Sequence, residues 1–139
     1  MPGTTIWWPA SPRPQMKGER LDGVAVVGQQ APLSFLNAPG FRAEVMTVIG
    51  DEQPKLLVLE ASGMVEIDFT AAQTLLDLIR QCRAEGVTVA MARLESTRAQ
   101  QAFERFRIHD VLPRDHIFFS VDEAVRNLGN GPATANTPL

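Results

Sequence analysis

A continuous apolar run of strand length, Leu56 to Leu59, lies between Pro54 and Gly63 in the middle of this chain. A strand that is apolar on both faces must be covered on both, and such strands are typical of parallel sheets flanked by helices. A second run of strand type follows at 87–92, after a segment with helical periodicity. Because parallel strands need a long crossover between them, this alternation predicts an α/β fold.

The rest of the middle of the chain continues the alternation. Strands are predicted at 24–29, 33–36, 55–61, 87–92 and 117–119, and helices at 37–50, 70–86, 95–106 and 120–128. The predicted order is therefore β-β-α-β-α-β-α-β-α. We expect a mixed, mostly parallel sheet of about four to five strands, with about four helices and right-handed crossovers.

The two ends of the chain differ from the middle. Residues 1–20 contain four prolines and show no apolar periodicity, so they are expected to form an extended arm or linker. Residues 129–139 are small and polar and are expected to form a disordered tail. The segment between them, 21–128, has the size of one ordinary domain.

Charge and cysteine content argue against several classes of function. The chain has 139 residues, with 13 Lys and Arg against 16 Asp and Glu, which gives a formal net charge of −3. This charge gives no reason to expect binding to nucleic acid or to an anionic membrane surface. The single cysteine cannot form an internal disulfide, which favours a reducing, cytoplasmic compartment. Because the chain has neither an apolar run of about 18 residues nor a signal peptide, we expect it to be soluble as given.

Candidate catalytic residues are scarce. His109 and His116 have no serine, cysteine or carboxylate at a recognisable motif spacing, which favours surface or capping roles for both. Cys82 falls on the apolar stripe of the predicted helix at 70–86, where a thiol packs as a small hydrophobic group. The sequence has no glycine-rich phosphate loop and no cluster of metal-ligand residues. We therefore expect no enzymatic activity and no bound metal.

One strand-to-helix turn, from Glu66 to Ala71, combines a carboxylate with a hydroxyl. Thr70 and Gln73 have the spacing of a capping box, which predicts that Thr70 caps the helix and that Asp68 supports the turn. The alternative is that Thr70 accepts a phosphate, because the N–H groups and dipole of a helix N-terminus stabilise negative charge. The residue chemistry alone favours the cap.

Several short motifs also follow one another in a fixed order. They are Leu21-Asp22-Gly23-Val24, then Ala-Pro-Leu-Ser-Phe-Leu-Asn-Ala at 31–38, then Leu57-Val58-Leu59-Glu60, then Ile67-Asp68-Phe69-Thr70-Ala71. This order resembles a STAS domain over about residues 20–128, most of all those at the cytoplasmic C-terminus of SulP-type sulfate permeases and related anion transporters. In that family a Pro-Leu-x-Phe-x-Asn-Ala segment recurs, which Pro32 to Ala38 matches. An Asp followed by two hydroxyl residues and Gly also recurs, which is looser here because Phe69 and Ala71 replace two of its residues.

The resemblance implies a non-enzymatic regulatory domain of a SulP-like sulfate or anion transporter, on the cytoplasmic side of the cell membrane. Such a domain would act by docking to the membrane domain of the parent transporter, to a second copy in a homodimer, or to a soluble regulatory protein. The implied regulatory surface is the turn formed by Asp68, Phe69, Thr70 and Ala71. The Pro-rich arm would then link this domain to the last membrane helix.

The resemblance also implies two alternatives. In free-standing anti-sigma-factor antagonists the position of Thr70 is a serine that a partner kinase phosphorylates, although the bulk of Phe69 beside it argues against such a phosphoswitch here. STAS domains have also been proposed to bind guanine nucleotides. The matching place is a crevice between two helix starts, formed by Ser34, Asn37, Asp68 and Thr70, where helix N-termini favour anions. No other cofactor is expected.

The segment at 31–38 has a purely structural explanation as well. Leu33 and Phe35 have the spacing of core-facing residues of a strand, and Asn37 is a good helix cap. No ligand is needed to explain these residue types.

Overall fold

The computed structural model describes residues 5–9, 23–29 and 31–129, which form a five-stranded sheet with helices on both faces. The strands lie across the sheet in sequence order: β1 (Thr5–Pro9), β2 (Val24–Gln29), β3 (Leu56–Glu60), β4 (Thr88–Ala92) and β5 (Ile117–Phe118). β1 pairs with β2 antiparallel, and the three other neighbouring pairs are parallel. The predicted mixed, mostly parallel α/β fold is confirmed.

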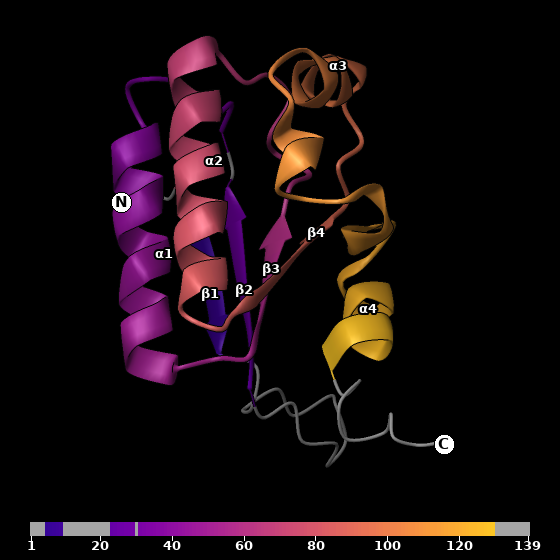
Figure 1. Cartoon of the computed structure of the whole chain (residues 1–139). Helices are drawn as coiled ribbons and strands as arrows, with labels where there is room; N and C mark the ends of the chain where they lie inside the picture. The colour runs from indigo at the N-terminus through magenta and orange to yellow at the C-terminus, as the bar shows by residue number, and fades with distance from the viewer. Residues whose placement is uncertain (1–4, 10–22, 30, 130–139) are drawn as a thin grey trace.

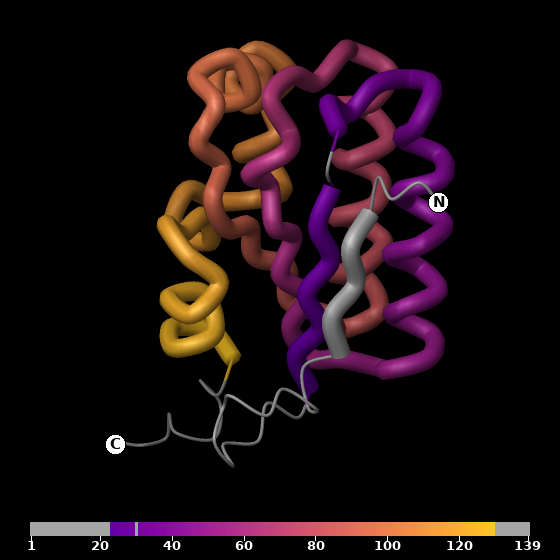
Figure 2. Tube along the Cα trace, turned by 180° about the vertical axis from the view of Figure 1, so that it is seen from behind, coloured from indigo at the N-terminus to yellow at the C-terminus, as the bar shows by residue number. Residues whose placement is uncertain are grey.

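The described part of the chain has four α-helices: α1 (Ala38–Glu52), α2 (Phe69–Ala84), α3 (Thr97–Arg105) and α4 (Val121–Ala124). Two 3-10 turns, η2 (Ile108–Asp110) and η3 (Arg114–His116), precede β5, and a π-helical turn, η4 (Val125–Gly129), continues α4. Since right-handed crossovers between successive parallel strands fall on one side, α1, α2 and α3 share one face of the sheet (Figure 1). α4 follows the last strand and packs on the other face, and Figure 2 shows the sheet from behind, with α1 and α2 beyond it.

Both faces of β3 are buried, as its apolar run predicts. Leu57 and Leu59 belong to the large core beneath α1, α2 and α3. Leu56 and Val58 belong to a smaller core on the opposite face, which includes Ala124 of α4. Alternate residues of a strand point to opposite faces, so an uninterrupted apolar run needs helices on both sides.

The end of α2 is set by a glycine. Gly86 has φ +83°, a left-handed conformation that residues with a Cβ rarely adopt. Its N–H donates to the carbonyl oxygen of Arg83 at 3.0 Å, and the N–H of Val87 donates to that of Cys82 at 2.9 Å. These bonds satisfy carbonyl groups of the last helical turn, so the chain leaves α2 and enters β4 almost at once.

Two segments differ from the prediction. Residues 33–36 do not form a strand: Leu33 alone makes a bridge, to Ile67, and a turn follows at 35–37. The strand that pairs with β2 at this end of the sheet is instead β1, Thr5–Pro9, which lies within the predicted Pro-rich arm. Proline is compatible with such a strand because one side of an edge strand has no ladder partner. The rest of the predicted arm, and the tail beyond residue 129, lie outside the described residues.

Candidate functional site

A single carboxylate, that of Asp68, holds the turn before α2. Asp68 is the N-cap residue of this helix, and its Oδ1 accepts a hydrogen bond from the N–H of Ala71 at 2.8 Å. Its Oδ2 accepts a second bond, at 2.9 Å, from the N–H of Phe35, 33 positions away in the sequence. One side chain therefore joins the loop before α1 to the start of α2, by charge-assisted bonds of the stronger kind.

Thr70 does not cap α2, so that prediction is wrong. Asp68 occupies the cap position, and Thr70 is the second residue of the helix, with an exposed side chain. Threonine and aspartate are both good cap residues, and the local sequence does not choose between them. The N–H of Phe35 favours Asp68, because only the carboxylate has a second oxygen that can accept this distant bond.

The loop before α1 is closed by Asn37. Its Oδ1 accepts a hydrogen bond from the N–H of Ser34, and its Nδ2 donates to the carbonyl oxygen of Pro32, both at 2.8 Å. Asn37 is the N-cap residue of α1, as predicted, but its side chain makes no hydrogen bond to the helix. It folds the loop back on itself instead, which is a common role of asparagine in turns.

Backbone hydrogen bonds place the two loops side by side. The N–H of Leu33 donates to the carbonyl oxygen of Glu66 at 3.0 Å, and the N–H of Asp68 donates to that of Leu33 at 3.3 Å. The side chain of Leu33 is buried in the large core, as predicted, and anchors this contact. The two loops therefore form one hydrogen-bonded unit.

Three large apolar side chains are exposed on this unit: Phe35, Leu36 and Phe69, with 59%, 78% and 61% of their surface accessible. The prediction that Phe35 faces the core is wrong, because the chain turns after Ser34 and the strand period is lost. The ring of Phe69 also meets Phe106 edge-on, with centroids 5.8 Å apart. We call Phe35, Leu36, Asp68 and Phe69 the Asp68 face.

The residues of the predicted anion crevice are only partly brought together. A cavity of about 320 Å³ lies between the loops and α3, and its walls include Ser34, Glu66, Asp68, Arg98 and Arg105. Asn37 and Thr70 do not line it. Arg98 is already paired with Glu66, and the carboxylate of Asp68 takes the N–H of Ala71 that an anion would use. Guanine nucleotide binding stays a prediction.

The cysteine thiol and the two histidine rings are buried or lie against backbone carbonyl groups. Cys82 is fully buried, and burial raises the pKa of its thiol to about 11, so it is protonated at neutral pH. His109 Nδ1 lies 3.2 Å from the carbonyl oxygen of Leu112, and His116 Nδ1 lies 3.0 Å from that of Val89.

Within the described residues, no group of His, Cys, Asp and Glu side chains is arranged to hold a metal. Across the same residues, no helix has the length and apolar character needed to span a membrane.

Sequence comparison relates the chain to one protein family. The family model of the STAS domain matches residues 15–124. A probable sulfate transporter of Mycobacterium tuberculosis is 34% identical over 115 residues, which cover 81% of this chain and 20% of the transporter. The chain therefore spans about a fifth of the length of this relative.

Solved structures give the same relationship. A sulfate transporter family protein from Wolinella succinogenes has a TM-score of 0.66 and 25% identity, over 76% of this chain and 84% of that one. An anti-sigma factor antagonist from Mycobacterium paratuberculosis shares the fold, with a TM-score of 0.65 and 17% identity over 79% of this chain and 89% of that one. With a family model that matches most of its length, the chain belongs to the STAS domain family, and of these relatives the two of highest identity are a probable sulfate transporter and a sulfate transporter family protein.

Proposed function

We propose that this chain is the regulatory interaction domain of a SulP-like sulfate or anion transporter, on the cytoplasmic side of the membrane, and that it acts by docking rather than by catalysis. The observation that carries the proposal is the Asp68 face, where two phenylalanines and a leucine are held in solvent by hydrogen-bonded turns. Aromatic side chains are the usual anchors of protein interfaces. Burying them against a partner is favourable by roughly 25 cal/mol per Å² of apolar surface.

The proposed occupant of the Asp68 face is the membrane domain of the parent transporter. In the Mycobacterium tuberculosis relative the match covers only 20% of the protein, so most of that transporter lies outside it. Two domains of one chain meet at a high effective concentration, so a modest apolar face suffices for docking between them. A second copy of this chain and a soluble regulatory protein are the competing occupants.

The test is to express the membrane domain of the parent protein separately and measure its affinity for this chain in detergent. Phe69→Ser and Leu36→Ser are each expected to weaken binding about tenfold, because each removes an anchor. The control is Phe119→Ser, which removes a side chain that is 90% exposed outside the Asp68 face. We expect this control to bind like the wild type.

Three results contradict the proposal. They are unchanged affinity in both Asp68-face variants, an equal loss in the Phe119→Ser control, and a parent reading frame without a membrane domain. If the wild type dimerises and Phe69→Ser abolishes the dimer in sedimentation, the Asp68 face belongs to a second copy of the chain instead.

A phosphoswitch like that of the free-standing antagonists is the second candidate. The observation that favours it is the exposure of Thr70 at the second position of α2, where the helix dipole stabilises a phosphate. The carboxylate of Asp68 at the same helix end works against it, because like charges repel. Incubation with the cognate kinase and mapping of the phosphate by mass spectrometry decides the question. Modification of other residues with Thr70 unmodified rules this candidate out.

A further inference from the structure

Two neighbouring strands send the chain to opposite faces of the sheet. From the carboxyl end of β4 the chain passes to α3, on the face of α1 and α2, whereas from β5 it passes to α4, on the other face. In open α/β sheets a crevice opens outside the carboxyl ends of two such strands, and small molecules bind there. The connections that follow β2, β3 and β4 all run over the same face of the sheet. No crevice of this kind is therefore expected between β2 and β3 or between β3 and β4.

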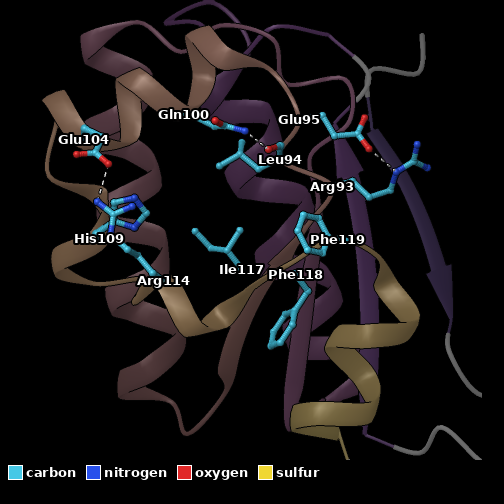
Figure 3. A pocket seen from close by; sticks show the side chains of 10 residues that line it. All are labelled: Arg93, Leu94, Glu95, Gln100, Glu104, His109, Arg114, Ile117, Phe118 and Phe119. Carbon is cyan, nitrogen blue, oxygen red and sulfur yellow. Dashed lines mark hydrogen bonds and ion pairs between the residues drawn. The ribbon is translucent and has the colours of Figure 1, made fainter.

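The structure has a cavity at this point. Its volume is about 480 Å³, and its lining includes 93–95 after β4 and 117–119 on the side of β5 (Figure 3). Glu104 of α3 and Arg114 of η3 line its far end. The volume lies within the roughly 300 to 1,000 Å³ of small-molecule sites. We call this cavity the β4–β5 crevice; it shares no residue with the Asp68 face.

The β4–β5 crevice has an apolar middle and two charged ends (Figure 3). The middle is formed by Leu94 and by 117–119. At one end, Nε of Arg93 lies 3.4 Å from a carboxylate oxygen of Glu95 and 3.6 Å from one of Glu60, whose side chain is mostly buried. At the other end, Nη2 of Arg114 lies 2.5 Å from a carboxylate oxygen of Glu104. The members of the Arg93–Glu95 and Arg114–Glu104 pairs are about half exposed or more, and such pairs contribute little to stability, so a ligand can replace one partner in either pair.

Arg93 has an unusual backbone conformation. Its φ is +63°, in the left-handed region that is unfavourable for a residue with a Cβ. Its N–H donates to the carbonyl oxygen of Phe118 at 2.9 Å, which extends the pairing of β4 with β5, and its side chain lines the cavity. Strained residues of this kind cluster at ligand sites, where the surrounding structure holds them in place.

We propose that the β4–β5 crevice binds a small zwitterion with an apolar or aromatic body, such as an aromatic amino acid. Two arginines, two glutamates and His109 line the crevice, and the charges of the arginines and glutamates balance. A polyanion would meet two carboxylates, and a ligand with a single charge would separate an Arg–Glu pair and satisfy only one member. A zwitterion inserts its carboxylate at the arginine and its ammonium at the glutamate of the same pair, while its ring packs on the apolar middle.

The test uses the ¹⁵N-labelled 139-residue chain and L-phenylalanine as the probe, followed by amide chemical shifts. L-phenylalanine is expected to shift the amides at 93–95 and 117–119 with single-site saturation. Phenylacetate lacks the ammonium and phenethylamine lacks the carboxylate, so each is expected to bind about tenfold more weakly. GDP serves as the polyanion and is expected to leave these amides unchanged.

A double variant, Arg93→Gln with Arg114→Gln, is expected to weaken binding of L-phenylalanine about tenfold or more. The control is Arg80→Gln, because Arg80 pairs with Asp77 on the exposed side of α2. Unchanged amide shifts away from the crevice show that each variant is folded, and the single variants replace the double one if it is not. The proposal is overturned if L-phenylalanine causes no shifts up to its solubility limit, if phenylacetate or GDP binds as tightly, or if the variants bind like the wild type.

Discussion

The Asp68 turn and the β4–β5 crevice both follow strands of the same sheet and both contain carboxylates, but the carboxylates have different partners. Asp68 accepts hydrogen bonds from two backbone N–H groups in two separate loops. Glu95 and Glu104 instead contact exposed arginine side chains beside a cavity. A carboxylate bound to the backbone fixes the shape of a surface, whereas one paired with an exposed side chain is available to a ligand. The partner, rather than the residue type, distinguishes the two roles.

The largest expected effect is on the Asp68 turn. Asp68→Ala removes both hydrogen bonds and leaves the N–H groups of Phe35 and Ala71 without this acceptor. We expect the free energy of unfolding to fall by about 3 kcal/mol, measured by urea denaturation. The control Asp77→Ala, at an exposed pair with Arg80, is expected to change it by less than about 0.5 kcal/mol. Similar values for the two variants would contradict the role given to Asp68.

A smaller loss of stability is expected when the loop before α1 is altered. Asn37→Ala removes the hydrogen bonds to Ser34 and Pro32 and should lower the free energy of unfolding by about 1 to 2 kcal/mol. Asn127→Ala is the matched control, since its amide donates only to a carbonyl oxygen of the short last helix, that of Glu123. If both variants lose the same free energy of unfolding, the hydrogen bonds of Asn37 do not have the stabilising role in the loop before α1 that is given to them here.

The strain at Arg93 predicts a difference between two substitutions. Arg93→Gly and Arg93→Ala both remove the ion pairs of the side chain, but only glycine accepts φ +63° without cost. The glycine variant is therefore expected to be more stable than the alanine variant by about 1 kcal/mol in urea denaturation. Equal stabilities, or a more stable alanine variant, would show that the backbone at this position is not strained.

The smallest effect is expected at the far end of the crevice. The hydrogen bond and charge of Arg114 hold the pKa of Glu104 below its usual range. A lowered pKa means that the ion pair favours folding above the ordinary carboxyl pKa and loses this contribution as the pH falls through the lowered value. Because the pair is exposed, Glu104→Gln should leave the urea midpoint at neutral pH unchanged. An NMR titration should show the Glu104 pKa return toward its ordinary value in Arg114→Gln, and an unchanged value would contradict the pairing.

The parts of the fold that could be predicted are those encoded within one strand or helix. The apolar run Leu56 to Leu59 required cover on both faces of β3, and both cores are present. Gly86 marked the end of α2, and it lies directly after the C-cap residue of that helix. These features depend on neighbours a few residues away, so the local pattern contains the information.

The predictions that the structure contradicts concern places where a segment distant in the sequence determines the local structure. The cap of α2 depends on the N–H of Phe35, which the sequence near Thr70 does not reveal. Phe35 is exposed because Asn37 turns the loop, although alternation alone placed it in the core. The pairing of Thr5–Pro9 with β2 likewise depends on a partner across an intervening segment.

The β4–β5 crevice could not be predicted for a related reason. Arg93 and Arg114 form no motif in the sequence, and they line one cavity because Arg93 follows β4 whereas Arg114 lies in η3, directly before the β5 strand that pairs with β4.

Hydrogen–deuterium exchange of the chain, free and bound to the membrane domain of its parent protein, tests the proposed docking most directly. The proposal predicts slower exchange at the amides of 34–36 and 69–71, which lie at the Asp68 face, and unchanged exchange at 117–119. Slower exchange at 117–119 or in α4, without a change at the Asp68 face, would contradict it.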